Sequence, residues 1–166
     1  MDSFNFDVFK LKNILDLEED DYINIQKYKD QCIPLVENIV EQFYAIVSDD
    51  PELMNFFVYK TNLERAMKWQ KAYFIELLQG IVNDDYTQKR IHSGWLHAEI
   101  GLPVSFYIAF YRFFTVNIFE KAVTVAEIPI DENFHSYIIS LVKLILFDLS
   151  ISIEVHEKTL LDHQKK

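Results

Sequence analysis

Apolar side chains recur at the three- and four-residue spacing of α-helices along nearly the whole chain. The stretch before Pro34 begins with an acidic run, Glu18 to Asp21, which favours a helix start, and the proline then interrupts it. Beyond the proline one apolar stripe continues to Val47, with Tyr44 at its edge, until the run SDDPE marks a turn. The pattern predicts a helical turn at PELMNFF and then longer helices over residues 62–80, 83–101 and 104–123 and from 132 onward.

Glycine and proline mark the ends of these longer helices. Gly80 and Gly101 follow apolar stretches, as glycines at helix C-termini do, and Pro103 suits the first turn of the next helix. The chain holds only three glycines and four prolines, too few for the many turns of an all-β protein of this length. The sequence therefore predicts an all-α fold.

The last predicted helix is apolar on nearly all sides between Tyr137 and Val155, more than a helix covering one core face needs. A membrane span is disfavoured, because Lys143, Asp148 and Glu154 fall in this stretch and each costs about 2.5–3.5 kcal/mol near a bilayer centre. We expect one side of the helix to face its own core and the other a second subunit. The predicted assembly is a homodimer through the last two helices, which form a four-helix bundle across the two-fold axis.

Length and composition favour a single domain over residues 1–166, because half of the chain is apolar and can fill one core. Within it, residues 1–16 form an N-terminal extension, and residues 157–166 form a polar tail or the start of a linker to an output domain. The formal net charge of −10 disfavours nucleic acid and anionic membranes as partners. Cys32 is the single cysteine and no targeting segment is apparent, so a cytoplasmic location is expected.

The candidate chemistry centres on His97, in the run LHAEIGLP at the end of a predicted helix. One interpretation is a partly buried histidine whose positive charge complements the helix dipole. The other is a neutral imidazole that offers Nε2 to a haem iron while a backbone carbonyl near Ser93 or Gly94 holds Nδ1–H. The 14 Phe and nine Tyr fit either a large aromatic core or the wall around a planar ligand. These patterns leave both interpretations open.

Two longer runs carry a family resemblance. RIHSGWLHAEIGLPVSFYIAFYRFF resembles the globin domain of the globin-coupled sensor family, in which a histidine before Ile-Gly-Leu-Pro and an aromatic-rich helix is the proximal haem ligand. VENIVEQFYAIVSDDPEL resembles that family's B helix, whose Phe-Tyr pair supplies the distal tyrosine. His97 and Tyr44 take these two positions, and their separation of 53 residues in sequence number fits the family's layout. The resemblance runs from about Leu17 to the last helix and implies a sensor-globin fold with an extra short N-terminal helix and no clear D helix.

The resemblance implies a bacterial gas sensor rather than an enzyme. It would bind haem b through His97 alone, take up dioxygen, carbon monoxide or nitric oxide, and signal to a C-terminal output domain or partner. Because family members usually carry such an output domain after the globin, this chain is expected to be a single-domain member or an excised sensor. Two alternatives stay open: a haem-free globin-like interaction module of a stress-signalling assembly, and a haem dioxygenase for nitric oxide, which the lack of a distal acid–base pair disfavours.

The resemblance also directs attention to the residues around the haem. Tyr44 would donate to bound dioxygen, unless it is a core tyrosine bonded to a backbone carbonyl. Counting back from Gly80 puts Trp69 on the distal side, and a slight rotation of the helix would bring Gln70 there instead. The further pocket candidates are Phe43, Phe56, Phe57, Met67, Tyr73, Phe74, Ile100, Tyr107, Phe110 and Tyr111. Surface roles are expected for the other histidines, which are His92, His135, His156 and His163.

Overall fold

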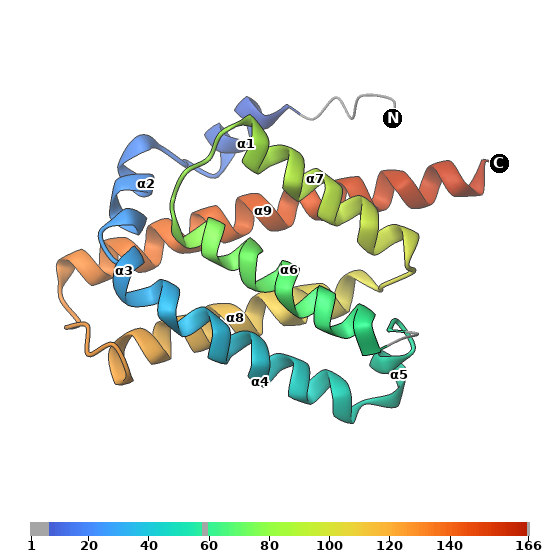
Figure 1. The fold of residues 1–166 in the computed structure, drawn as a ribbon. Helices are drawn as coiled ribbons and strands as arrows, with labels where there is room; N and C mark the ends of the chain where they lie inside the picture. Colours follow the sequence, from blue (N-terminus) through green and yellow to red (C-terminus); the bar gives the residue numbers. More distant parts are fainter. Residues whose placement is uncertain (1–6, 58–59, 166) are drawn as a thin grey trace.

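The computed structural model describes residues 7–57 and 60–165, and within these ranges the chain is helical and contains no strand (Figure 1). In chain order the elements are α1 (Val8–Ile14), α2 (Glu19–Gln26), α3 (Lys29–Cys32), the 3₁₀ turn η1 (Ile33–Leu35), α4 (Val36–Asp49), α5 (Pro51–Met54), α6 (Lys60–Leu78), α7 (Asp84–Glu99), α8 (Val104–Thr124) and α9 (Glu132–Gln164). The predicted all-α class is confirmed, and the bounds of α6, α7 and α8 lie within two residues of the predicted ones.

Side-chain caps and left-handed glycines explain where the helices begin and end. Asn83 and Asp131 accept hydrogen bonds from the backbone N–H groups three residues later, which satisfies donors that the first turns of α7 and α9 leave unpaired. Gly80 and Gly101 follow α6 and α7 with φ angles of 61° and 70°, a conformation that glycine adopts without strain. The corner after α7 is therefore encoded in the sequence.

The helices pack so that α6 and α7 lie side by side on one face, with α4 and α8 next to α6 and α9 behind α7 (Figure 1). The long helix α9 contacts α7 and α8 over its length and α2 near its beginning. The predicted N-terminal extension contributes α1, whose Val8 and Leu11 pack against the core. The first six residues of that extension, and residues 58–59 of the segment where a D helix would lie, are outside the described ranges.

The polar segment from residue 157 onward is helical, since α9 continues to Gln164. Thr159 is buried, and Lys158 pairs with Glu154 at 2.5 Å one turn earlier, so this segment has both a packed face and a favourable charge pair. The last helix therefore runs through most of the segment that the sequence analysis gives as a polar tail or the start of a linker.

Outward-facing apolar side chains are present on the last two helices. On α8, Phe106, Ile108 and Val116 are each more than one-third exposed. On α9, Ile139, Leu146, Leu160 and Leu161 are exposed to a similar degree. None of the described helices is both long enough and apolar enough to cross a bilayer.

Candidate functional site

A cavity of about 500 Å³ lies between α4, α6, α7 and α8. Aromatic and aliphatic side chains form most of its wall, and the polar groups that reach it come from few positions. A largely apolar cavity of this size with a few polar groups is the usual form of a small-molecule or cofactor site. The residues that line it include Phe43, Tyr44, Val47, Phe57, Gln70, Tyr73, Phe74, Leu96, His97, Tyr107, Phe110 and Tyr111.

His97 lies in the last turn of α7 and faces this cavity. Burial lowers the pKa of the imidazole to about 4, with a smaller contribution from nearby His156, so the ring is neutral near pH 7. Its Nδ1 atom is buried and has no hydrogen-bond partner in the described part of the chain. The expected bond to a carbonyl near Ser93 or Gly94 is therefore absent, and the ring lies against that of Tyr107 with the centroids 4.9 Å apart.

Tyr44 and Gln70 meet on the opposite wall. The Tyr44 hydroxyl donates to Gln70 Oε1 at 2.7 Å, joining α4 to α6, and Tyr44 is only 5% exposed. Burial raises the pKa of Tyr44, so its phenol keeps its proton. The structure thus pairs Tyr44 with a side-chain amide rather than with a backbone carbonyl, and both residues line the cavity.

Trp69 lies at the mouth of the cavity rather than deep within it. Its side chain is 54% exposed, and its ring centroid is 6.5 Å from that of His92 on α7. His92 in turn stacks on Trp95 with the centroids 5.5 Å apart. We call Trp69, His92 and Trp95 the rim cluster.

The other pocket candidates from the sequence line the cavity, with one exception. Met67 does not reach it and packs as a partly buried core residue. The residues of α6 that do line the cavity are Ala66, Trp69, Gln70, Ala72, Tyr73, Phe74 and Glu76. Phe56, Phe57 and Ile100 complete the cavity wall near its opening.

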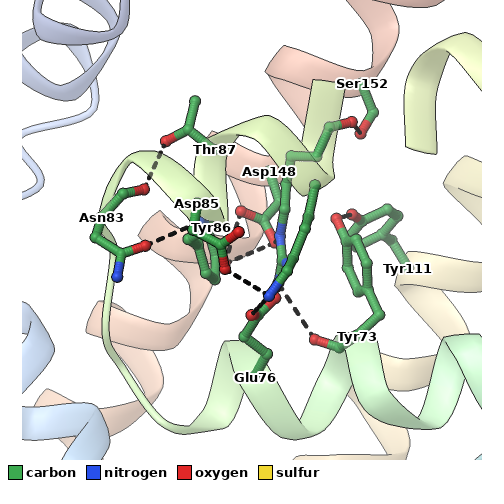
Figure 2. A network of polar contacts seen from close by, with 11 residues as sticks. Tyr73, Glu76, Asn83, Asp85, Tyr86, Thr87, Tyr111, Asp148 and Ser152 are labelled. Carbon is green, nitrogen blue, oxygen red and sulfur yellow. Dashed lines mark hydrogen bonds and ion pairs between the residues drawn. The ribbon is translucent and has the colours of Figure 1, made fainter. Parts of the chain in front are cut away.

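Sequence reasoning missed a buried ionic network beside the cavity. Arg90 and Asp148 are both fully buried, and Arg90 Nε donates to Asp148 Oδ2 at 3.0 Å. The Tyr86 hydroxyl lies 2.8 Å from each oxygen of the same carboxylate. Figure 2 shows Asp148, Tyr86 and Glu76 converging on one point between α6, α7 and α9, where Glu76 Oε2 accepts from Arg90 Nη1 at 2.5 Å.

Aromatic rings enclose the same guanidinium. Its central carbon lies 3.8 Å from the centroid of the Tyr73 ring and 3.6 Å from that of the Tyr86 ring. Stacking of this kind adds cation–π attraction to the ion pair. The position of Asp148 in the sequence could have predicted this network, because a carboxylate inside an apolar helix needs a charged or hydrogen-bonding partner.

His156 was predicted to be on the surface, and this prediction was wrong. The side chain is only 4% exposed and its Nε2–H donates to the Leu102 carbonyl at 3.0 Å. Burial follows from the crossing of α9 with the end of α7, which no local pattern in the sequence encodes. His135 and His163 are exposed as predicted, and His92 is exposed at the rim.

The side chains that could bind a metal indicate which kind of metal-containing group this cavity suits. In the described ranges, no group of three or more His, Cys, Asp or Glu side chains is arranged to hold a metal ion. A bare ion would therefore lack ligands here, whereas a planar prosthetic group that brings its own equatorial ligands needs one neutral imidazole and apolar walls. His97 and the aromatic lining supply these features.

Comparisons with known proteins agree with this geometry. Residues 5–162 match the sequence model of the Protoglobin family. The globin domain of a globin-coupled sensor from Geobacter sulfurreducens has a similar structure, with a TM-score of 0.75 and 18% identity over 87% of this chain and 93% of that one. The ferric globin domain of DosC from E. coli is also similar, with a TM-score of 0.67 and 17% identity over 91% of this chain and 97% of that one. These likenesses show a globin fold.

Proposed function

The chain belongs to the Protoglobin family, and from that premise we propose that it binds haem b through His97 and acts as a sensor of dioxygen or another diatomic gas. The observation that carries this proposal is a neutral imidazole facing an apolar cavity of about 500 Å³. Its match to globin domains of sensors supports a sensing role rather than a catalytic one. Nitric oxide and carbon monoxide are the other candidate gases.

Haem, when bound, would supply a ferrous iron that takes up a diatomic gas reversibly. His97 would be the residue that binds the iron, and its low pKa keeps the ring nitrogen unprotonated and available to a metal. Phe43, Phe110 and Leu96 would hold the planar group by apolar contact and exclude water.

The Tyr44–Gln70 pair would set the polarity of the distal side. Tyr44 Oη–H binds Gln70 Oε1 rather than the amide nitrogen, which orients Gln70 Nε2 and its two N–H donors. Two donors are thus available for a gas that carries negative charge: the phenol after it leaves Gln70, or the amide that the phenol orients. Both would favour dioxygen, which draws electron density from ferrous iron, over nearly neutral carbon monoxide.

Replacing Tyr44 by phenylalanine is expected to speed dioxygen dissociation by about ten- to a hundredfold and to change carbon monoxide dissociation little. The phenol hydrogen bond to a partly charged acceptor is worth about 1.5–3 kcal/mol, and about 1.4 kcal/mol is a factor of ten. Stopped-flow release of both gases measures this. Equal effects on both gases would mean that Tyr44 acts by shape alone. No effect on either would transfer the role to Gln70, Trp69 or a water, which Gln70→Leu then tests.

The rival function is a haem-free interaction module with the same fold. An absorption spectrum of the reduced protein, recorded before and after addition of dioxygen and carbon monoxide, separates the two. We expect a Soret band that shifts with each gas. Purified protein that takes up no added haem and shows no Soret band would contradict the sensor proposal.

We also propose that the chain is a homodimer and that α8 and α9 form the interface. The exposed apolar residues on these helices support this proposal, among them Val116, Leu146 and Leu161. Stable interfaces of this kind bury about 2,000 Å² or more, so sedimentation at micromolar concentration should show a dimer of the 19.7 kDa chain. A well-behaved monomer at high concentration would contradict this prediction. Signals would then pass through this bundle to a C-terminal output domain or partner.

A further inference from the structure

Three polar side chains form a stripe along the buried face of α9. Asp148, Ser152 and His156 follow one another at intervals of four residues, so they lie on one side of the helix. None is more than 4% exposed, and apolar Ile151 and Val155 lie between them. Burial of polar groups is unfavourable unless each finds a partner, and all three find theirs on α7 or on the corner that follows it.

The first contact lies two turns before His97. Asp148 pairs with Arg90, and the Tyr86 hydroxyl also binds the carboxylate, so α7 supplies two side chains to one group on α9 (Figure 2). A buried charge pair with this many hydrogen bonds resists sliding, because displacement would leave a charge without a partner.

The second contact is a close approach of the two backbones. A Cβ atom built on Gly94 would lie 2.5 Å from the Ser152 carbonyl oxygen, closer than real Cβ contacts allow. The Ser152 hydroxyl donates to the Arg90 carbonyl at 3.4 Å, and Figure 2 shows Ser152 extending from α9 toward α7. The helices therefore touch without intervening side chains one turn before His97.

The third contact leads to His97 itself. His156 Nε2–H donates to the Leu102 carbonyl at 3.0 Å, and the Leu102 N–H donates to the His97 carbonyl at 2.9 Å. Two successive hydrogen bonds thus connect α9 to the residue that would bind haem. Contacts on the N-terminal side and on the C-terminal side of His97 thus hold α7 and the corner after it against α9.

We propose that Asp148, Ser152 and His156 are positioning residues, which fix the place of His97 and couple its movement to the end of α9, residues 157–164. This inference rests on the proposed function, since His97 moves only if it holds a gas-binding group. A displacement of His97 would change the position of α7 relative to these three contacts, which span about two turns of α9 directly before residues 157–164.

Hydrogen exchange of the haem-loaded protein, with and without carbon monoxide, tests the coupling. We expect exchange of residues 157–164 to differ by at least about fivefold between the two states, the lower end of typical couplings between sites. His156→Phe removes the donor but keeps a ring, and it should abolish this difference while haem and gas still bind. His156→Gln restores an N–H donor and should recover it. Ser150→Ala is the matched control, because Ser150 bonds only to Leu146 of its own helix.

Two results would overturn the proposal: a wild-type protein without the gas-dependent difference, or His156→Phe protein that retains it. Gly94→Ala provides a second test. This test is made on the protein without haem and does not depend on whether the His156→Phe protein folds. Its added methyl group must push α7 from α9, so exchange of residues 157–164 should rise in the apo protein by at least about fivefold. Unchanged exchange in Gly94→Ala would also overturn the coupling. Failure of the proposed function is distinguishable, because it shows as the absence of a Soret band in wild-type protein.

Discussion

Replacing His97 by alanine is expected to abolish stable haem uptake while leaving the helical content intact. His97 is the neutral imidazole at the cavity wall, and the other histidine of the cavity lining, His92, is exposed at the rim. Loss of the supporting partner of a metal ligand already weakens binding by about 10–100-fold, so loss of the ligand itself should weaken it further. Haem titration followed by absorption measures the affinity, and far-ultraviolet circular dichroism reports the helices.

His92 supplies the matched control for this experiment. It also lies on α7 at the edge of the cavity, but it is exposed and stacks on Trp95. His92→Ala should keep the histidine–iron spectrum of the wild type. Added imidazole should restore that spectrum to His97→Ala, since it replaces the missing ring. A normal five-coordinate histidine spectrum in His97→Ala without imidazole would show that another residue is the ligand.

Replacing Arg90 by methionine is expected to lower the free energy of unfolding by about 3–5 kcal/mol, the usual cost of leaving one charge of a buried pair alone. Asp148 would keep the Tyr86 hydroxyl and lose the guanidinium. Burial raises the pKa of Asp148, and Arg90 opposes this effect, so removal of Arg90 should raise that pKa further. Urea unfolding followed by circular dichroism gives the free energy.

An exposed ion pair provides the comparison. Lys71 on α6 pairs with Glu37 on α4, and Lys71→Met should cost less than about 1 kcal/mol, as surface pairs do. The double variant Arg90→Met, Asp148→Leu should recover part of the loss, because no buried charge is then unpaired. A cost below about 1 kcal/mol for Arg90→Met alone would show that the network contributes little to stability.

The sequence predicted the helices well because their ends depend on local signals. Asn83, Gly101 and Pro103 act within one turn of their own positions, so their effect is visible without the fold. The end of α9 has no local signal of this kind, because its sequence is polar and contains neither glycine nor proline, although Thr159 within it is buried.

The sequence predicted which residues belong to the candidate site better than it predicted the contacts between them. All the aromatic residues proposed from the sequence line the cavity, whereas the aliphatic candidate Met67 does not. The pairing of Tyr44 with Gln70 and the burial of His156 depend on how separate helices cross. The four-residue interval between Asp148, Ser152 and His156 can be read from the sequence. Its role is recognised only from the partners that these residues have on α7 and on the corner after it.

The tryptophans of the rim cluster should make the intrinsic fluorescence of the protein depend on whether a group occupies the cavity. Trp69 and Trp95 are its only two tryptophans; Trp69 lines the cavity mouth, and Trp95 stacks on His92 beside it. Tryptophan emission overlaps the absorption of porphyrins, so energy transfer to a group in the cavity would quench both indoles. Intrinsic fluorescence therefore offers a label-free view of cofactor exchange in this chain. The emission wavelength of the half-exposed Trp69 would also depend on whether the cavity mouth is open to solvent or covered.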